Sequence, residues 1–315
     1  MQQYWSLDDV QIQNAWLTIG SFDGVHRGHQ EIVHNLAAGA HSVGAPAVVL
    51  TFHPHPALVL GKRKDALYLT TPEQRAELLG ELGVDLVIIQ PFNLSVAGLR
   101  AEEFLTLINT HLHIKELWVG YDFAMGKGRE GNVEKLRQLS DTIGYHLDVV
   151  PPFVVDGEIV SSSRIRSLLA DGDVSEAARL LGRPYQLSGE VVTGDGRGRT
   201  IGVPTANLAI WPEQQLPKAG VYVCRAQVDG HWLGALTNVG PRPTFEPEDA
   251  ASRVEAHLLD FHADLYGQRI SLEFLEWLRP EEKFHSVQAL VDQMHLDIHQ
   301  GREMLAAVGL NNPKK

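Results

Sequence analysis

The pattern of apolar runs changes near residue 182, and this change constrains the fold more than any other feature of the chain. Before it, short β-branched runs alternate with helical patterns. After it, strand-like runs follow one another, with a long helical pattern only at the end. Alternation predicts a parallel sheet covered by helices, whereas successive strands joined by turns predict an antiparallel barrel. We therefore expect an α/β plus β protein, in which a Rossmann-like parallel-sheet domain precedes an antiparallel β-barrel with a closing helix.

The expected strands are short and bounded by Gly, Pro or Asp. In the first half they are Ala15–Ile19, Ala47–Phe52, Leu86–Gln90, Glu116–Gly120 and His146–Val150. In the second half they are Gln186–Thr193, Gly220–Val228, Trp232–Val239, Arg253–Phe261 and Ile270–Trp277. Helical patterns cover Ser161–Ala170, Asp173–Leu181 and Ser286–Ala307, and Thr71 with Gln74 predicts a capping box. We place the domains at residues 1–182 and 183–310, followed by a tail at 311–315.

Charge and cysteine content exclude several classes of protein. The chain carries 27 basic and 39 acidic residues, a net charge of −12, which argues against a non-specific nucleic-acid binder. A single cysteine, Cys224, allows no intrachain disulfide and fits a reducing compartment. The N-terminus has no signal-peptide pattern, and no run of about 18 apolar residues occurs. We expect a cytoplasmic protein with neither a nucleic-acid nor a membrane partner; the oligomeric state stays open.

A glycine-rich loop follows the first predicted strand and leads into a helical pattern. Gly24 and Gly28 let a phosphate approach the backbone, and a helix N-terminus supplies free N–H groups. His26 and His29 flank Gly28 and can donate hydrogen bonds to the same phosphate chain. These features suit nucleotidyl transfer, in which the attacking group is already an anion and needs no base.

Three further segments of the first half contain candidate binding residues. Thr51–Pro56 and Gly120–Arg129 follow predicted strands, and Ser161–Arg166 opens a helical pattern with hydroxyl groups and two arginines. Gly120–Arg129 is not a Walker A loop, because Gly128 stands where that motif requires Ser or Thr. The serine–arginine segment is an anion site or a capped surface helix in about equal measure.

The second half has its own glycine-rich loop, Gly194–Gly202, with no helix after it. Thr205 and Asn207 are two residues apart in an extended segment, so their neutral oxygen ligands share one side, as Mg²⁺ ligands can. Glu255 lies in a strand with apolar residues at Val254, Leu258 and Leu259. The residues alone leave it paired with Arg253 or a neighbouring strand, the favoured interpretation, or positioned as a general base.

Two other features indicate structure rather than chemistry. His295 and His299 lie one helical turn apart but have no evident third ligand, so we expect a surface helix rather than a metal site. Cys224 follows Val221-Tyr222-Val223 in a predicted strand, and we expect a buried small side chain.

Taken together, these motifs occur in one order from about Leu17 to Leu305, and the chain resembles the bacterial bifunctional riboflavin kinase/FMN adenylyltransferase (FAD synthetase) family. The first half resembles the adenylyltransferase module through Gly20–His29, Thr51–Pro56, Gly120–Gly126 and Ser162–Arg166. The second half resembles the kinase module through Gly198–Asn207, Leu216–Tyr222, Asn238–Phe245, Val254–His257 and Asp264–Gly267. The resemblance implies that the barrel phosphorylates riboflavin to FMN and the first domain adenylylates FMN to FAD. ATP is the co-substrate of both steps, and Mg²⁺ is the implied metal.

The resemblance also implies the site residues. For the adenylyl step, ATP is bound by Gly20, Ser21, Phe22, Asp23, Gly24, His26, Gly28, His29, Ser162, Ser163 and Arg166, of which His26, His29 and Arg166 stabilise the developing charge. Phe52 and Asp122 are implied near the flavin of FMN. In the kinase, ATP is bound by Gly194, Gly196, Gly198, Arg199, Gly202, Thr205 and Asn207. Thr205 and Asn207 hold the metal, and Glu255 becomes the catalytic base, which reverses the interpretation from the residues alone.

The sequence departs from the family pattern at two places. Ser163 stands where the family usually has Thr, and Ala124-Met125 replaces a basic residue followed by Phe. Two alternatives stay open: an FMN adenylyltransferase with a non-catalytic flavin-binding barrel, and a flavin-binding sensor. An adenylyltransferase for another acceptor leaves the kinase-like half unexplained.

Overall fold

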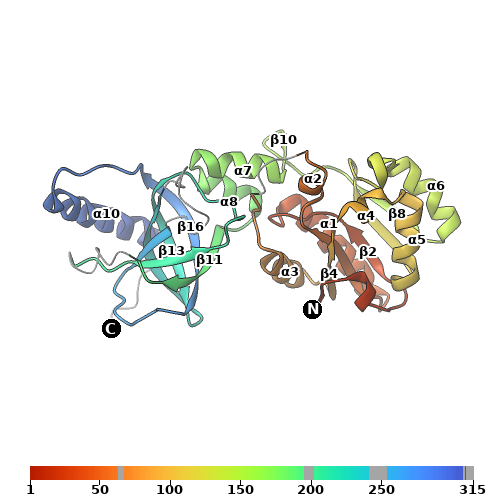
Figure 1. Ribbon diagram of the computed structural model, residues 1–315, viewed down its shortest axis with the longest axis horizontal. Coiled ribbons are helices and arrows are strands. Elements are labelled where there is room, and N and C mark those ends of the chain that lie inside the picture. The colour runs from red at the N-terminus through yellow and green to blue at the C-terminus, as the bar shows by residue number, and fades with distance from the viewer. Residues whose placement is uncertain (63–66, 195–201, 241–253, 308, 310–315) are drawn as a thin grey trace. The chain divides into compact units, whose positions relative to one another are not determined.

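The computed structural model describes residues 1–62, 67–194, 202–240, 254–307 and 309 (Figure 1). The chain divides into two compact units, Met1–Ser162 and Ser163–Lys315. We describe each unit by itself. The first contains a parallel sheet and the second a closed barrel, so the predicted fold class is confirmed.

The sheet of the first unit has six parallel strands in the order β1-β4-β3-β2-β5-β8. Its strands are β1 (Gln2–Tyr4), β2 (Trp16–Ile19), β3 (Ala47–His53), β4 (Leu86–Pro91), β5 (Glu116–Gly120) and β8 (His146–Val150). The chain moves outward from β2 in one direction through β3 and β4, and in the other through β5 and β8. Ligands of such sheets bind at the carboxyl ends of the strands, beside the point where the order reverses. Here that point is between β2 and β5.

Helices cover both faces of this sheet because side chains of successive strand residues alternate between the faces. In β3, Val49 packs with α1 and α3 residues, whereas Val48 and Leu50 pack with α5 and α6 residues. The helices of the first unit are α1 (Arg27–Ser42), α2 (Pro56–Val59), α3 (Pro72–Glu81), α4 (Leu94–Gly98), α5 (Ala101–Leu112) and α6 (Val133–Ile143). Two-stranded hairpins complete the unit: β6 (Ala124–Met125) with β7 (Gly131–Asn132), and β9 (Val154–Val155) with β10 (Glu158–Ile159). Two 3-10 turns are η1 (Leu7–Asp9) and η2 (Lys127–Arg129).

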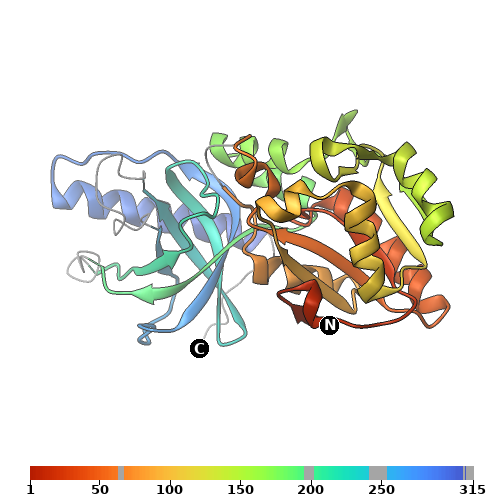
Figure 2. The same ribbon diagram turned by 45° about the vertical axis from the view of Figure 1, so that its right-hand side comes forward.

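The second unit contains a six-stranded antiparallel barrel, closed in the order β11-β12-β15-β14-β13-β16. Its strands are β11 (Tyr185–Val192), β12 (Ala206–Ile210), β13 (Gly220–Val228), β14 (His231–Val239), β15 (Val254–Leu258) and β16 (Arg269–Arg279). The closing helix α10 (Val287–Ala307) lies alongside the barrel strands (Figure 2). Gly234 and Gly301 permit this close packing, because a Cβ at either would overlap a leucine of the other element. None of the described helices combines the length and apolar character that a membrane span needs.

Helices α7 (Ser162–Asp171) and α8 (Val174–Leu181) belong to the second compact unit except for the first residue of α7. The buried face of α8, which includes Leu180 and Leu181, packs against β11 and β16. The boundary between the compact units, at Ser162 and Ser163, therefore lies about 20 residues before the predicted functional boundary at residue 182. That functional boundary stays a prediction.

One strand of the sheet and one of the barrel were not expected from the sequence, and neither were the short strands of the two hairpins. β1 is a three-residue edge strand made of Gln2, Gln3 and Tyr4, too short and polar to stand out. β12 alternates half-buried Asn207 with buried Leu208, and this short run follows directly on the glycine-rich loop. Its pairing with β11 and β15 completes the barrel.

Cys224 is fully buried in β13, as predicted, and burial raises the pKa of its thiol to about 12. Because the thiolate is the reactive species, we expect native protein to resist Ellman's reagent at about pH 8. Absorbance of the released thionitrobenzoate measures the reaction. In guanidinium chloride one equivalent should react, since the chain has one cysteine. Fast reaction of the native protein would contradict the buried position.

Candidate active sites

The first site forms where β2 ends and the chain turns into α1. Gly20 N donates to Leu50 O over 3.1 Å, which joins the turn to β3. The turn then passes through positive φ at Phe22 and Gly24. A Cβ at Gly24 would overlap the Leu69 side chain, so the close approach of this loop to residue 69 requires glycine. The predicted phosphate loop is thus a tight turn at the carboxyl edge of the sheet.

The two predicted histidines lie together at the N-terminus of α1. His26 is the N-cap, and its Nδ1 accepts from His29 N over 3.3 Å. Consequently the neutral His26 ring carries its proton on Nε2, where it is a donor. The rings of His26 and His29 stack with centroids 3.6 Å apart, and Gly28 leaves room for the His26 ring. Two imidazoles at a helix N-terminus form an arrangement that can bind a phosphate chain.

Asp23 anchors this loop to the segment that precedes α3. Its carboxylate is buried and accepts from Leu69 N and Thr70 N over 2.9 and 3.2 Å. Ser162 Oγ donates to Asp23 O over 2.9 Å, so the structure brings this predicted site residue to the loop. The contacts assign Asp23 a structural role; its contact with ATP stays a prediction.

Arg75 of α3 donates a hydrogen bond to the same loop. This residue was given no role in the sequence analysis. Its guanidinium is 1% exposed, and Nη1 donates to Ser21 O, Thr51 Oγ1 and Phe52 O over 2.6, 2.9 and 3.3 Å. These acceptors lie at the ends of β2 and β3. Burial lowers the pKa of Arg75, and the nearby Asp23 charge opposes that shift. The signal was present in the sequence, because position 75 lies on the buried helix face with Ala76 and Leu79.

The remaining predicted residues of this half are less closely grouped. Phe52 is 9% exposed and packs against Phe92 and Phe104 in the core. Asp122 is exposed in the turn after β5, and Arg129 donates to its carbonyl oxygen over 3.2 Å. Their flavin contacts stay predictions, as do the roles of Ser163 and Arg166, which lie in α7 within the second unit.

The second site is a cavity of about 360 Å³ between α10 and one face of the barrel. Its apolar lining includes Val221 and Leu236 from strands, Phe284 before the helix, and Met294 and Ile298 from α10. Polar groups converge on the same space, namely Thr205, Asn238, Glu255, His257, Arg279, Glu281, Glu282 and Asp297. An apolar pocket with a few directed polar groups is the usual form of a small-molecule site.

Strand register brings the candidate catalytic residues together. Glu255 of β15 lies directly opposite Asn207 of β12 and, on its other side, Asn238 of β14. Opposite residues of antiparallel strands share a face, so the three form a row across three strands. Thr205 Oγ1 donates to Glu255 Oε2 over 3.5 Å, a long contact. The predicted pairing of Glu255 with Arg253 lies outside the described residues.

The row contains a further residue to which the sequence reasoning gave no role. Asn238 Nδ2 donates to Glu281 Oε1 over 3.0 Å, whereas its buried Oδ1 has no hydrogen-bond partner within the described part of the chain. A buried acceptor of this kind calls for a donor or a cation. With the Thr205 and Asn207 oxygens and the Glu255 carboxylate, the site offers the all-oxygen donor set that Mg²⁺ prefers.

The glycine-rich loop is described only at its two ends. At Gly194, a Cβ would overlap the Asn207 amide, so the loop leaves β11 in close contact with a predicted metal ligand. At the other end, Gly202 has a φ of +83°. Gly196, Gly198 and Arg199 lie outside the described residues.

An ion pair joins strand β16 to helix α10 at the wall of the cavity. Arg279 of β16 forms hydrogen bonds of 2.8–3.1 Å to the Asp297 carboxylate, which is itself buried in α10. His257 Nδ1 lies 2.8 Å from Pro204 O, and burial lowers the pKa of this imidazole. At neutral pH the ring is therefore uncharged, with Nδ1–H donating to the carbonyl and Nε2 as an acceptor.

The predicted surface position of His295 and His299 agrees with the structure. Both are exposed on α10, and His299 Nε2 lies 3.5 Å from Glu303 Oε1. Over the described ranges, the one group of three or more side chains with converging metal-ligand atoms is elsewhere, in the first unit.

Comparison with known proteins gives two family matches, one for each part of the chain, and the first ends close to the boundary between the two compact units. A family described as FAD synthetase matches residues 9–164, and one described as riboflavin kinase matches residues 181–305. A Listeria monocytogenes protein named bifunctional riboflavin kinase/FMN adenylyltransferase is 35% identical, with 93% of each chain covered. An Escherichia coli protein of that name is 37% identical, over 98% of this chain and 97% of the other. A Streptococcus pneumoniae crystal structure titled macrolide-efflux protein is 32% identical, with a TM-score of 0.86 and coverages of 95% and 98%.

Replacement of Arg75 by Met should destabilise the first unit by about 2–4 kcal/mol, because three acceptors at buried strand ends lose their donor. Urea unfolding followed by the fluorescence of Trp16 and Trp118 measures the change. The matched control is Arg137→Met, whose ion pair with Glu134 is exposed and contributes little. Equal urea midpoints for the two variants would contradict the role given to Arg75.

Proposed function

The chain belongs to the family of bifunctional riboflavin kinase/FMN adenylyltransferases, and we propose how its two sites divide the work. The protein phosphorylates riboflavin to FMN and adenylylates FMN to FAD, with ATP as co-substrate of both steps. Riboflavin, FMN and FAD are accordingly its ligands. The barrel carries the kinase reaction and the parallel-sheet domain the adenylyl transfer, with the functional boundary near residue 182.

In the kinase step, a neutral hydroxyl must lose a proton as it attacks. Glu255 takes the proton of the riboflavin 5′-hydroxyl, the hydroxyl oxygen bonds to the γ-phosphorus of ATP, and ADP leaves with the bridging oxygen. The apolar cavity beside Glu255 receives the flavin ring system. The observation that carries this assignment is the row of Asn207, Glu255 and Asn238 at the edge of an apolar cavity.

Thr205 and Asn207 are the residues that would hold Mg²⁺, and Asn238 Oδ1 adds a buried oxygen nearby. When bound, the ion neutralises charge on the phosphates. Gly194, Gly196, Gly198, Arg199 and Gly202 contribute backbone N–H groups and one cation to the ATP phosphates. The close approach of Gly194 to the Asn207 amide supports a phosphate loop that starts beside the metal ligands.

In the adenylyl step, the attacking group is already ionised. An FMN phosphate oxygen bonds to the α-phosphorus of ATP, and pyrophosphate leaves, so no general base is required. His26 and His29 donate to the α-phosphate as negative charge develops there, and the N-terminus of α1 adds backbone donors. Ser162, Ser163 and Arg166 complete the anion site, with Gly20, Ser21, Phe22, Asp23, Gly24 and Gly28 shaping the loop around ATP. Phe52 and Asp122 lie on the flavin side.

We propose that the enzyme acts in the cytoplasm, without a nucleic-acid or membrane partner. Its acidic composition and single cysteine support this assignment.

Replacement of Glu255 by Gln should lower FMN formation from riboflavin by at least about 100-fold, because the base is lost while the shape of the side chain is kept. FAD formation from supplied FMN should persist in the same preparation. Both products are followed by chromatography. The matched control is Glu190→Gln, because Glu190 is an exposed glutamate of the same barrel, in β11. Normal FMN formation by Glu255→Gln would refute the base assignment.

Replacement of His29 by Ala should lower FMN adenylylation about 100- to 1,000-fold, the usual effect of removing one donor to developing charge. Riboflavin phosphorylation should stay at the wild-type rate. His34→Ala is the matched control, since His34 is exposed on the same helix. An equal loss in both reactions would indicate unfolding rather than a catalytic role.

Metal chelation tests the oxygen-ligand site. Excess EDTA should abolish phosphorylation of riboflavin, and Mg²⁺ should restore it. The variant Asn207→Ala should require a higher Mg²⁺ concentration for half-maximal rate, at least about tenfold. Unchanged Mg²⁺ dependence would remove Asn207 from the ligand set.

A further inference from the structure

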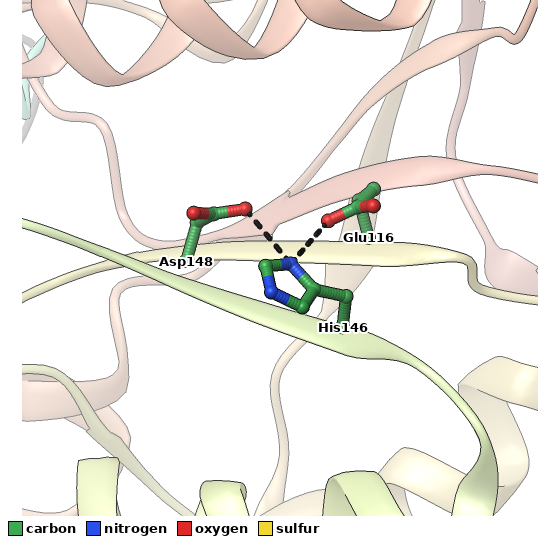
Figure 3. A group of neighbouring side chains, drawn as sticks. All are labelled: Glu116, His146 and Asp148. Carbon is green, nitrogen blue, oxygen red and sulfur yellow. Dashed lines mark hydrogen bonds and ion pairs between the residues drawn. The ribbon is translucent and has the colours of Figure 1, made fainter.

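A group of three side chains lies outside both active sites, at the amino ends of β5 and β8. Glu116 and His146 are the first residues of these strands and lie directly opposite each other in the sheet. Asp148 is two residues further along β8 and therefore on the same face as His146. Figure 3 shows the imidazole of His146 between the two carboxylates.

The geometry is that of three ligands facing one point. His146 Nδ1 lies 2.9 Å from Glu116 Oε2 and 3.2 Å from Asp148 Oδ2. The three ligand atoms all lie within 4.8 Å of one another. Two ligands bound tetrahedrally to one zinc ion are about 3.4 Å apart, given bond lengths of about 2.0–2.2 Å. The two distances to His146 Nδ1 are therefore within about 0.5 Å of the separation that a shared ion needs.

A single proton satisfies this group poorly. One Nδ1–H must be shared between two carboxylates, and two negative charges then face one positive ring. A divalent ion balances both carboxylates and takes the Nδ1 lone pair as a third ligand.

We propose that Glu116, His146 and Asp148 bind one divalent transition-metal ion of the zinc type. The ligand chemistry selects this class, because imidazole suits zinc and its neighbours in the first row, whereas Mg²⁺ and Ca²⁺ prefer oxygen alone. Exposure of the group leaves the remaining coordination positions to water. This site is distinct from the all-oxygen donor set in the barrel.

The position of the site suggests what the ion does. β8 is the last strand of the sheet and pairs only with β5. An ion bound to Glu116 on one strand and to His146 and Asp148 on the other cross-links this edge pair where it starts. The phosphate loop follows the opposite, carboxyl end of the strands. The ion is therefore a structural link and takes no part in either transfer reaction.

Zinc binding by the full-length protein, measured by competition with a chromophoric chelator and without nucleotide, tests the proposal. We expect one zinc equivalent whose affinity falls at least about tenfold in His146→Ala and also in Glu116→Gln and Asp148→Asn. The matched control is His299→Ala, an exposed histidine with one carboxylate neighbour but no converging third ligand in the described structure. The His299→Ala variant should bind zinc with the affinity of the wild type. Wild-type FMN and FAD formation by the variants, assayed with Mg²⁺, checks that they are folded.

Diffraction at the zinc absorption edge gives a second measurement that does not depend on the variants. An anomalous peak among His146 Nδ1 and the two carboxylates is expected in crystals soaked with zinc. Unchanged affinity in His146→Ala, or absence of the peak at this position, would overturn the proposal.

Discussion

One buried guanidinium determines the shape of the first active site. The chain leaves β2 and β3 at neighbouring points, where Ser21 O, Thr51 Oγ1 and Phe52 O lie. Arg75 reaches these three acceptors from α3 through Nη1. The nearby Asp23 charge offsets part of the cost of burying this cation. The phosphate loop is thus held rigid before any nucleotide arrives, and the histidine pair at the start of α1 takes its position from that loop.

In the barrel, strand register positions the candidate site residues, as Arg75 positions the loop after β2 in the first unit. Asn207, Glu255 and Asn238 are far apart in the sequence, but pairing of β12, β15 and β14 aligns them. Because side chains alternate along each strand, a slip of one residue would turn the whole row to the other face. Packing of α10 against Val221 and Leu236 resists such a slip, and the Arg279–Asp297 pair fixes the helix itself. The position of Glu255, the proposed base, therefore follows from the apolar contacts of the barrel.

The sequence predicted those helices and strands that a continuous run of neighbouring residues marks. Five of the six strands of the sheet are short runs of largely apolar residues between turn residues, and each was predicted within one residue of its bounds. β12 was not predicted, because two of its five residues, Ala206 and Asn207, are half-buried beside a glycine-rich loop and no apolar run marks the strand. Arg75 was missed for a different reason. Helical spacing places it on the buried face of α3, but its acceptors come from two distant loops, which no spacing along the chain reveals. The cavity likewise exists only when α10 closes over barrel residues such as Val221 and Leu236, which lie far from it along the chain.

The acidic balance of the chain explains why both sites rely on local donors. A net charge of −12 gives no general attraction for ATP or FMN, and salt screens charges more than about 8–10 Å away. Each site must therefore supply its own positive potential at contact distance. The first does so with a helix N-terminus and two imidazoles, which suit a reaction that starts from an anion. The second places a carboxylate beside oxygen ligands for a metal, which suits a reaction that must first remove a proton. The difference between the two sites thus follows from the charge of the attacking group in each reaction.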